Sequence, residues 1–139
     1  MLSTRPLQHV DIYTDGACSP NPGTGGWGAI LISKKHDKRK ELSGSEAEST
    51  NNRMEMTAVI KGLEAVDPSA KVLISSDSTY VVNTMTKGWK RKANHDLWEQ
   101  LDALVKNRDV SWQWVKGHSG DRGNELADSL AAKEAGTAK

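Results

Sequence analysis

The stretch His9–Cys18 constrains the fold more than any other part of the sequence. Within it, residues 10–14 alternate with a two-residue period that is typical of a β-strand with one buried face. We expect this strand to end at Asp15, where Gly16 would allow the backbone to turn sharply. Because α/β sheets bind ligands beyond the carboxyl ends of their strands, Asp15 is a candidate functional group. The competing interpretation is that Asp15 and Gly16 form the turn of a β-hairpin.

The pattern of apolar residues predicts two further strands and then helices that alternate with strands. The expected strands are 27–33, 39–45, 72–76 and 110–115, and the expected helices are 53–66, 79–86, 96–106 and a last one capped by Asn124. Three strands with short connections form an antiparallel meander, and each helical crossover then returns a strand parallel to its predecessor. The sequence therefore predicts an α/β fold in which the first and fourth strands lie side by side.

Composition limits the class of protein. With 139 residues we expect a single domain, residues 1–139, large enough to bury a core. The 19 Lys and Arg against 18 Asp and Glu give a net charge of +1, so any nucleic-acid-binding surface must be local. Cys18 is the only cysteine, which suits a reducing compartment. No apolar run approaches the roughly 18 residues of a membrane span, and Met1 to Gln8 lack a signal-peptide core, so we predict a cytoplasmic location with no membrane partner.

Further acids lie where they can join Asp15. Glu55 lies at the edge of the apolar stripe of its helix, although its spacing from Asn52 also fits a capping box. Asp77 follows the strand that we expect beside the first one, although it can equally be the N-cap of the next helix. Asp128 falls about one turn into the last helix. Each acid has an ordinary structural explanation, and only their combination points to a site.

Four carboxylates in one place would destabilise a fold unless cations balanced them. Hard carboxylate oxygens without a Cys or His cluster suit Mg²⁺ or Mn²⁺ and not Zn²⁺. Magnesium keeps several waters and bridges to phosphate groups, so the chemistry indicated is metal-assisted phosphodiester cleavage.

Two other regions bear on function. The segment Lys87-Gly88-Trp89-Lys90-Arg91-Lys92 combines four cations with one aromatic ring and is a candidate nucleic-acid contact, although basic loops are common on neutral proteins. His118 lies among glycines in a loop, where a lone histidine is more often incidental than functional. Trp112 and Trp114 share a face of the last strand, and we expect both to belong to the core.

Six motifs occur in order along the chain: Tyr13-Thr14-Asp15-Gly16-Ala17-Cys18, Asn21-Pro22-Gly23, Thr50-Asn51-Asn52-Arg53-Met54-Glu55, Ser76-Asp77-Ser78, Trp114-Val115-Lys116-Gly117-His118 and Asn124-Glu125-Leu126-Ala127-Asp128. Together they resemble type 1 ribonuclease H of the bacterial kind over about residues 10–132. The resemblance implies a ribonuclease H-like fold, a five-stranded mixed sheet of three antiparallel and then two parallel strands flanked by helices. It also implies a monomeric, Mg²⁺-dependent endoribonuclease that uses two ions, accepts Mn²⁺, and cleaves the RNA strand of RNA–DNA hybrids to leave 5′-phosphate and 3′-hydroxyl ends.

The resemblance also assigns roles to residues. The metal-binding carboxylates would be Asp15, Glu55, Asp77 and Asp128, and His118 would shuttle a proton or assist product release. Asn124 would lie near the attacking water. The residues that would contact the hybrid are Gly16, Cys18, Asn21, Thr50, Asn51, Asn52, Thr79, Trp89, Lys90, Arg91, Lys92 and Asn124.

The chain departs from the family pattern at two places. Only residues 87–95 separate two helices between which bacterial members usually carry a longer basic handle, and Thr79 replaces a glutamine found in many relatives. Neither departure touches the four acids, so we expect activity to survive with weaker substrate binding. Two other functions remain open, a catalytically weak hybrid-binding module and a DNA-cleaving relative with the same fold.

Overall fold

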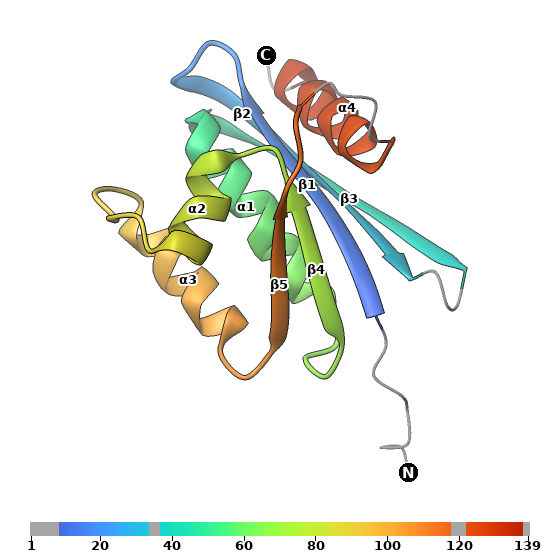
Figure 1. Ribbon diagram of the computed structural model, residues 1–139. Helices are drawn as coiled ribbons and strands as arrows, with labels where there is room; N and C mark the ends of the chain where they lie inside the picture. Colours follow the sequence, from blue (N-terminus) through green and yellow to red (C-terminus); the bar gives the residue numbers. More distant parts are fainter. Residues whose placement is uncertain (1–8, 34–36, 118–121, 138–139) are drawn as a thin grey trace.

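The computed structural model describes residues 9–33, 37–117 and 122–137, and these form a five-stranded sheet with helices on both faces (Figure 1). The sheet has the order β3-β2-β1-β4-β5. The strands are β1 (His9–Cys18), β2 (Gly23–Ser33), β3 (Lys38–Ser49), β4 (Lys71–Ser76) and β5 (Asp109–Trp114). The helices are α1 (Asn51–Glu64), α2 (Thr79–Lys87), α3 (His95–Val105) and α4 (Arg122–Thr137).

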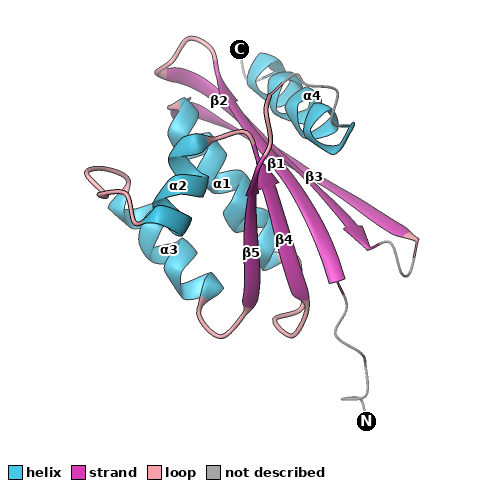
Figure 2. Ribbon diagram, in the orientation of Figure 1, coloured by secondary structure: helices cyan, strands magenta, loops and turns pink. Residues whose placement is uncertain are grey.

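The strand directions follow from the connections. β1 pairs antiparallel with β2, which pairs antiparallel with β3, whereas β1–β4 and β4–β5 are parallel. Helices α1 to α3 lie on one side of the sheet and α4 lies on the other (Figure 2). This confirms the predicted mixed sheet with the first and fourth strands side by side. No helix within the described ranges is long and apolar enough to cross a membrane.

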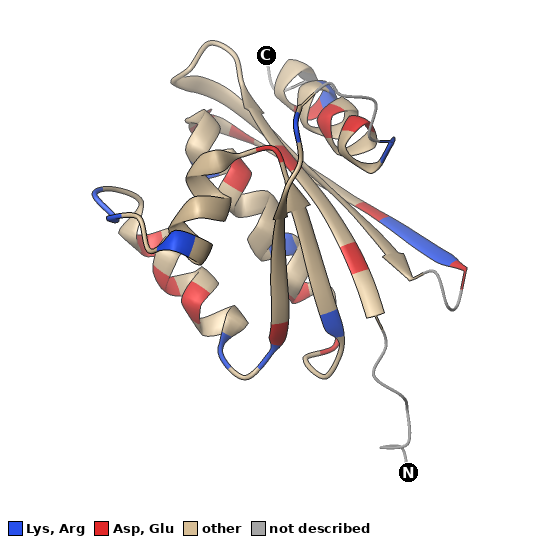
Figure 3. Ribbon diagram, in the orientation of Figure 1, with Lys and Arg blue, Asp and Glu red and all other residues tan. Residues whose placement is uncertain are grey.

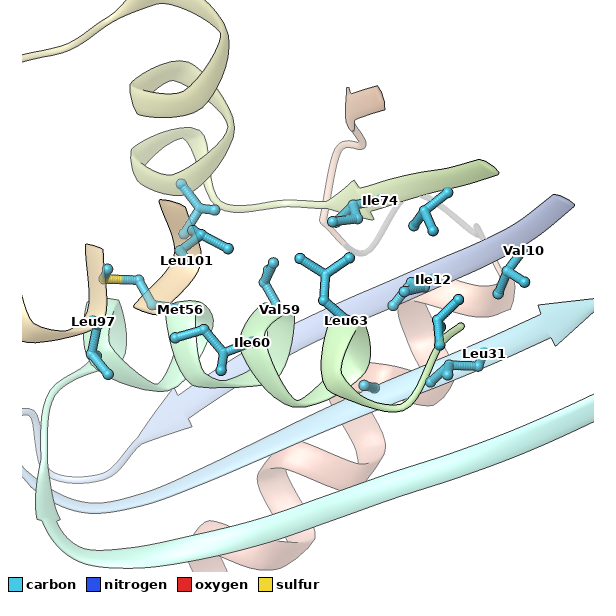
Figure 4. Packing of buried hydrophobic residues seen from close by; sticks show 14 of the residues in the cluster. Val10, Ile12, Leu31, Met56, Val59, Ile60, Leu63, Ile74, Leu97 and Leu101 are labelled. Carbon is cyan, nitrogen blue, oxygen red and sulfur yellow. The ribbon is translucent and has the colours of Figure 1, made fainter. Parts of the chain in front are cut away.

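The main core lies between the sheet and α1 (Figure 4). Ile12 of β1 and Ile74 of β4 are completely buried against Leu63 of α1, and α3 closes the same core with Leu97 and Leu101. The alternation in β1 explains this arrangement, because side chains at even positions point to α1 and those at odd positions point to α4. β1 therefore has both faces covered, which fixes its place at the centre of the fold.

Helix α4 packs on β2 through glycines and alanines. A Cβ atom on Gly26 would lie 2.2 Å from the carbonyl oxygen of Ala131, and one on Gly28 would lie 2.7 Å from that of Ala127. Both alanines are completely buried. The small side chains let the helix backbone approach the sheet closely, and this approach sets the position of the helix that carries Asp128.

We expect Gly26→Ala to lower the free energy of unfolding by about 1–3 kcal/mol, since the added methyl group would meet the backbone of α4 and force it outward. Gly136→Ala is the matched control, because nothing lies within 4 Å of a Cβ atom at Gly136. Alanine should leave the stability unchanged or raise it there. Urea denaturation of both variants measures the difference, and equal stabilities would show that α4 does not depend on this close contact.

The structure corrects the expected end of the first strand. β1 does not end at Asp15 but continues to Cys18, and Gly16 makes no turn because it pairs with Trp27 of β2. What ends near Asp15 is the parallel pairing with β4, whose last pair is Thr14 with Ser76. The hairpin interpretation of Asp15 and Gly16 is wrong for the same reason.

Several element ends also differ from the prediction. α1 begins at Asn51, and its N-cap is Thr50, whose Oγ1 accepts a hydrogen bond from the amide of Arg53. Glu55 is thus too far along the helix for the capping box with Asn52. Likewise Ser78, and not Asp77, is the N-cap of α2. α4 begins at Arg122, so Asn124 lies inside the helix and not at its cap.

Candidate metal centre

Three of the four predicted carboxylates meet beside the centre of the sheet. Asp15 comes from β1, Glu55 from α1 and Asp77 from the turn after β4, and one carboxylate oxygen of each lies within 4.8 Å of the others. The acidic segments of these three elements lie near one another in Figure 3. The three side chains come from separate parts of the chain and offer hard oxygen ligands, which are the ligands that Mg²⁺ prefers.

The local fold explains how these side chains meet. Because β1 and β4 run parallel and their pairing ends at Thr14 and Ser76, Asp15 and Asp77 are each the next residue beyond that pair. Gly16 then lets α1 approach, since a Cβ atom there would lie 2.4 Å from the amide nitrogen of Glu55. The absence of a side chain at position 16 therefore places Glu55 beside Asp15.

Burial and mutual repulsion hold protons on this cluster. Burial raises the pKa of Asp15 to about 8, helped by a side-chain hydrogen bond with Asp128 and by the charge of Asp77, while the amide of Gly16 acts in the opposite direction. That amide donates to Asp15 Oδ1 at 2.9 Å. The pKa of Glu55 is also raised well above its ordinary value, first by burial and then by the charges of Asp15 and Asp77. Groups of this kind are typical of functional sites.

The cluster fits a cation better than it fits protons alone. Oε1 of Glu55 is buried, and no hydrogen-bond donor for it occurs among the residues that the structure describes. A buried carboxylate oxygen without a donor costs free energy unless a cation contacts it. Asp128 of α4 is the fourth predicted ligand. It reaches Asp15 but is outside the group of three oxygens that lie within 4.8 Å of one another.

Several predicted substrate-contacting residues gather around the first turn of α1. Asn21 Oδ1 accepts a hydrogen bond from the amide of Asn51 at 3.1 Å, and Thr50 caps the helix. Asn52 is exposed, and the buried thiol of Cys18 lies beside them with its Sγ 3.3 Å from the carbonyl oxygen of Ser49. The β1–β2 loop and the start of α1 thus form one polar surface next to the carboxylate cluster.

Two of the remaining predicted residues, Thr79 and Asn124, lie at the starts of two different helices. Thr79 is exposed at the start of α2, and Asn124 is 2% exposed in the first turn of α4. His118 lies outside the described residues. The role of Asn124 near the attacking water stays a prediction.

The short basic segment has a defined conformation. Arg91 turns back onto α3, where its guanidinium donates two hydrogen bonds to Asp102 and lies 4.9 Å from the centre of the Trp98 ring. Trp89 is 47% exposed, and Lys90 and Lys92 are exposed. Lys87 is exposed as well, so the segment presents one aromatic ring and three ammonium groups outward, while Arg91 has an internal partner.

Arg53 belongs to the motif that ends at Glu55, but the sequence predicted no separate role for it. In the structure its guanidinium donates two hydrogen bonds to Asp96, and a third to the side chain of Asn94. The hydrogen bond from Arg53 is the main cause that lowers the pKa of Asp96 to about 2. Arg53 joins the start of α1 to the start of α3, and its place in the motif before Glu55 was the only signal of this role.

A five-stranded mixed sheet of this order, with a carboxylate cluster beside its central strand, defines the class of ribonuclease H-like folds. The sequence matches the RNase H family over residues 7–136. The chain therefore belongs to the RNase H family of nucleases.

Its relatives agree with this assignment. The chain is 51% identical to the ribonuclease H of Alcanivorax borkumensis over 138 residues, which is 90% of each chain. It is 50% identical to the ribonuclease HI of Neisseria meningitidis serogroup A over 141 residues, 92% of this chain and 96% of the relative. Among solved structures, the N-terminal RNase H domain of a Mycobacterium tuberculosis protein superposes with a TM-score of 0.82 at 29% identity, covering 94% of this chain and 96% of that one. LC11-RNase H1, solved in complex with an RNA/DNA hybrid, has a TM-score of 0.79 at 26% identity and covers 93% and 98%.

Proposed function

We propose that the protein cleaves the RNA strand of RNA–DNA hybrids with the help of bound Mg²⁺, for which Mn²⁺ can substitute, and leaves 5′-phosphate and 3′-hydroxyl ends. The observation that carries the proposal is the convergence of Asp15, Glu55 and Asp77, with a buried Glu55 oxygen that has no donor in the described part of the chain. Relatives that are about half identical carry the ribonuclease H name, and LC11-RNase H1 has been solved with a hybrid.

Asp15, Glu55 and Asp77 would hold the metal, and Asp128 would contribute from the side of α4. Two divalent ions held there would activate a water molecule and stabilise the leaving oxygen. The chain keeps the acids in place: the Gly16 amide holds Asp15 Oδ1, and the close approach of α1 holds Glu55. His118 would shuttle a proton or assist product release.

The polar surface around the first turn of α1 would recognise the hybrid. Short side chains and amides such as those of Asn21, Asn51 and Asn52 can bond to the 2′-hydroxyl groups that distinguish RNA from DNA. Trp89, Lys90 and Lys92 would contact the sugar–phosphate backbone farther along the duplex. Because Arg91 has an internal partner, we expect this second contact to be weaker than four free cations would give. The monomeric state and the cytoplasmic location remain predictions.

A cleavage assay with end-labelled RNA–DNA hybrid, double-stranded RNA and duplex DNA tests the function. We expect the hybrid alone to be cut, on the RNA strand, and only when Mg²⁺ or Mn²⁺ is present, because the acids need a cation to act. Excess EDTA should stop the reaction and added metal should restore it. Binding of the hybrid without cleavage would indicate the binding module, and cleavage of duplex DNA would indicate the DNA-cleaving relative.

A further inference from the structure

Trp114 is exposed although its sequence pattern suggested the core. It ends β5, the edge strand of the sheet, and is 49% exposed, whereas Trp112 on the same face packs against the core. Its indole Nε1–H donates a hydrogen bond to the main-chain oxygen of Asp77 at 3.1 Å. The only side-chain hydrogen bond that the structure gives this ring, within the described residues, thus ends on one of the three clustered acids.

The peptide unit that follows Asp77 is held from two sides. Its carbonyl oxygen accepts from Trp114, and its N–H, which belongs to Ser78, donates to Oγ of Ser76 at 3.0 Å. Ser76 is completely buried, and its own carbonyl oxygen accepts from the amide of Val115 at 2.9 Å. The backbone on both sides of Asp77 is therefore fixed by hydrogen bonds, two of which come from the end of β5 and the residue after it.

The chain after β5 also limits the carboxylate itself. A Cβ atom on Gly117 would lie 2.8 Å from Oδ2 of Asp77. Residues of the segment 114–117 therefore border Asp77, whereas Asp15 and Glu55 are contributed by other elements. Asp77 lies in a turn and not within a strand, so these contacts replace the ladder that fixes Asp15.

We propose that Trp114 is a positioning residue for Asp77. Its indole N–H fixes the rotation of the Asp77–Ser78 peptide unit, and this rotation keeps the Asp77 carboxylate within reach of Asp15 and Glu55. Groups behind a metal ligand commonly control its orientation in this way. The inference rests on the proposed function, because it concerns the geometry of the same metal centre.

Trp114→Phe tests the inference, because phenylalanine keeps an aromatic ring but has no donor. Trp112→Phe makes the same chemical change two residues earlier on the same strand and serves as the control. Mn²⁺ binding is measured by calorimetry without substrate, and folding by circular dichroism and thermal unfolding. We expect Trp114→Phe to weaken Mn²⁺ binding roughly 5- to 10-fold, the effect of losing one hydrogen bond that orients a ligand. Cleavage of the hybrid should need correspondingly more metal, with little change in KM. Trp112→Phe should lower thermal stability and leave Mn²⁺ affinity unchanged.

Ser76→Ala removes the second support of the same peptide unit and provides an answer if Trp114→Phe does not fold. Ser76→Ala should also weaken Mn²⁺ binding. Unchanged Mn²⁺ affinity in a folded Trp114→Phe or Ser76→Ala protein, with an active wild type, would overturn the positioning role and leave the proposed function intact. A wild type that neither binds Mn²⁺ nor cleaves the hybrid would overturn both.

Discussion

Asp15→Asn is expected to reduce cleavage of the hybrid by at least about 1,000-fold and to stabilise the metal-free protein. Asp15 is 4% exposed and interacts electrostatically with both Glu55 and Asp77. It is therefore the central acid of the cluster. An amide is a poor ligand for a hard cation, and the loss of several kcal/mol of charge stabilisation corresponds to about three powers of ten in rate. The same change removes a carboxylate that burial and its neighbours disfavour, so the fold should gain stability.

Single-turnover cleavage at saturating Mg²⁺ measures the first effect, and thermal unfolding in EDTA measures the second. Asp109→Asn is the control, because the substitution is chemically identical. Asp109 is an exposed acid at the start of β5, whereas the other end of this strand, Trp114, bonds to Asp77 of the cluster. It should retain wild-type activity and stability. If Asp15→Asn cleaved the hybrid at a rate near that of the wild type, the cluster would not be the catalytic centre.

The stability of the metal-free protein should fall as the pH rises between about 4 and about 8. The pKa of Asp15 is about 8 in the folded protein against an ordinary value of 3.8, so the folded state binds more protons than the unfolded state within this interval. The stability that the protonated Asp15 contributes is fully present below its pKa in the unfolded state. It is lost as the pH rises through its pKa in the folded state. The raised pKa of Glu55 acts in the same direction. We expect a change of at least about 2 kcal/mol, which corresponds to several degrees in Tm.

Melting temperatures of the wild type and Asp15→Asn, in EDTA and in Mg²⁺, separate this effect from other titrations. Mg²⁺ should raise the Tm of the wild type more at about pH 8 than at about pH 5, because the metal must displace the protons. Asp15→Asn should lose most of the pH dependence and most of the stabilisation by metal. A metal effect that was equal at all pH values, or a difference between the two proteins that did not change with pH, would contradict the raised pKa values.

The order of the strands could be predicted from the sequence because few arrangements satisfy the pattern. The alternation in His9–Cys18 and the apolar run before Asp77 identify the strands, and the rule for crossovers makes them parallel neighbours. From that pairing alone Asp15 and Asp77 had to lie close together, and they do. Glu55 could be placed on the correct helix, but its distance from Asp15 depends on how closely α1 approaches Gly16.

Other features depend on contacts between distant residues that no local pattern contains. The two-residue period of the last strand placed Trp114 in the core, but an edge strand buries little at its end, and the indole bonds to Asp77 instead. The sequence presents Arg91 as one more cation of a basic segment. In the structure its guanidinium bonds to Asp102 and lies over the Trp98 ring of α3. The predicted helix caps were wrong for a simpler reason, because polar residues adjacent to the true N-caps, Thr50 and Ser78, were equally good candidates.

The location of the bound cation tests the central claim most directly. Crystals grown with Mn²⁺ can be measured at a wavelength where manganese scatters anomalously, which identifies the ion independently of its coordination. The structure predicts an anomalous peak about 2 Å from carboxylate oxygens of Asp15, Glu55 and Asp77. An active protein whose crystals showed no manganese at these three side chains, or manganese only elsewhere, would contradict it.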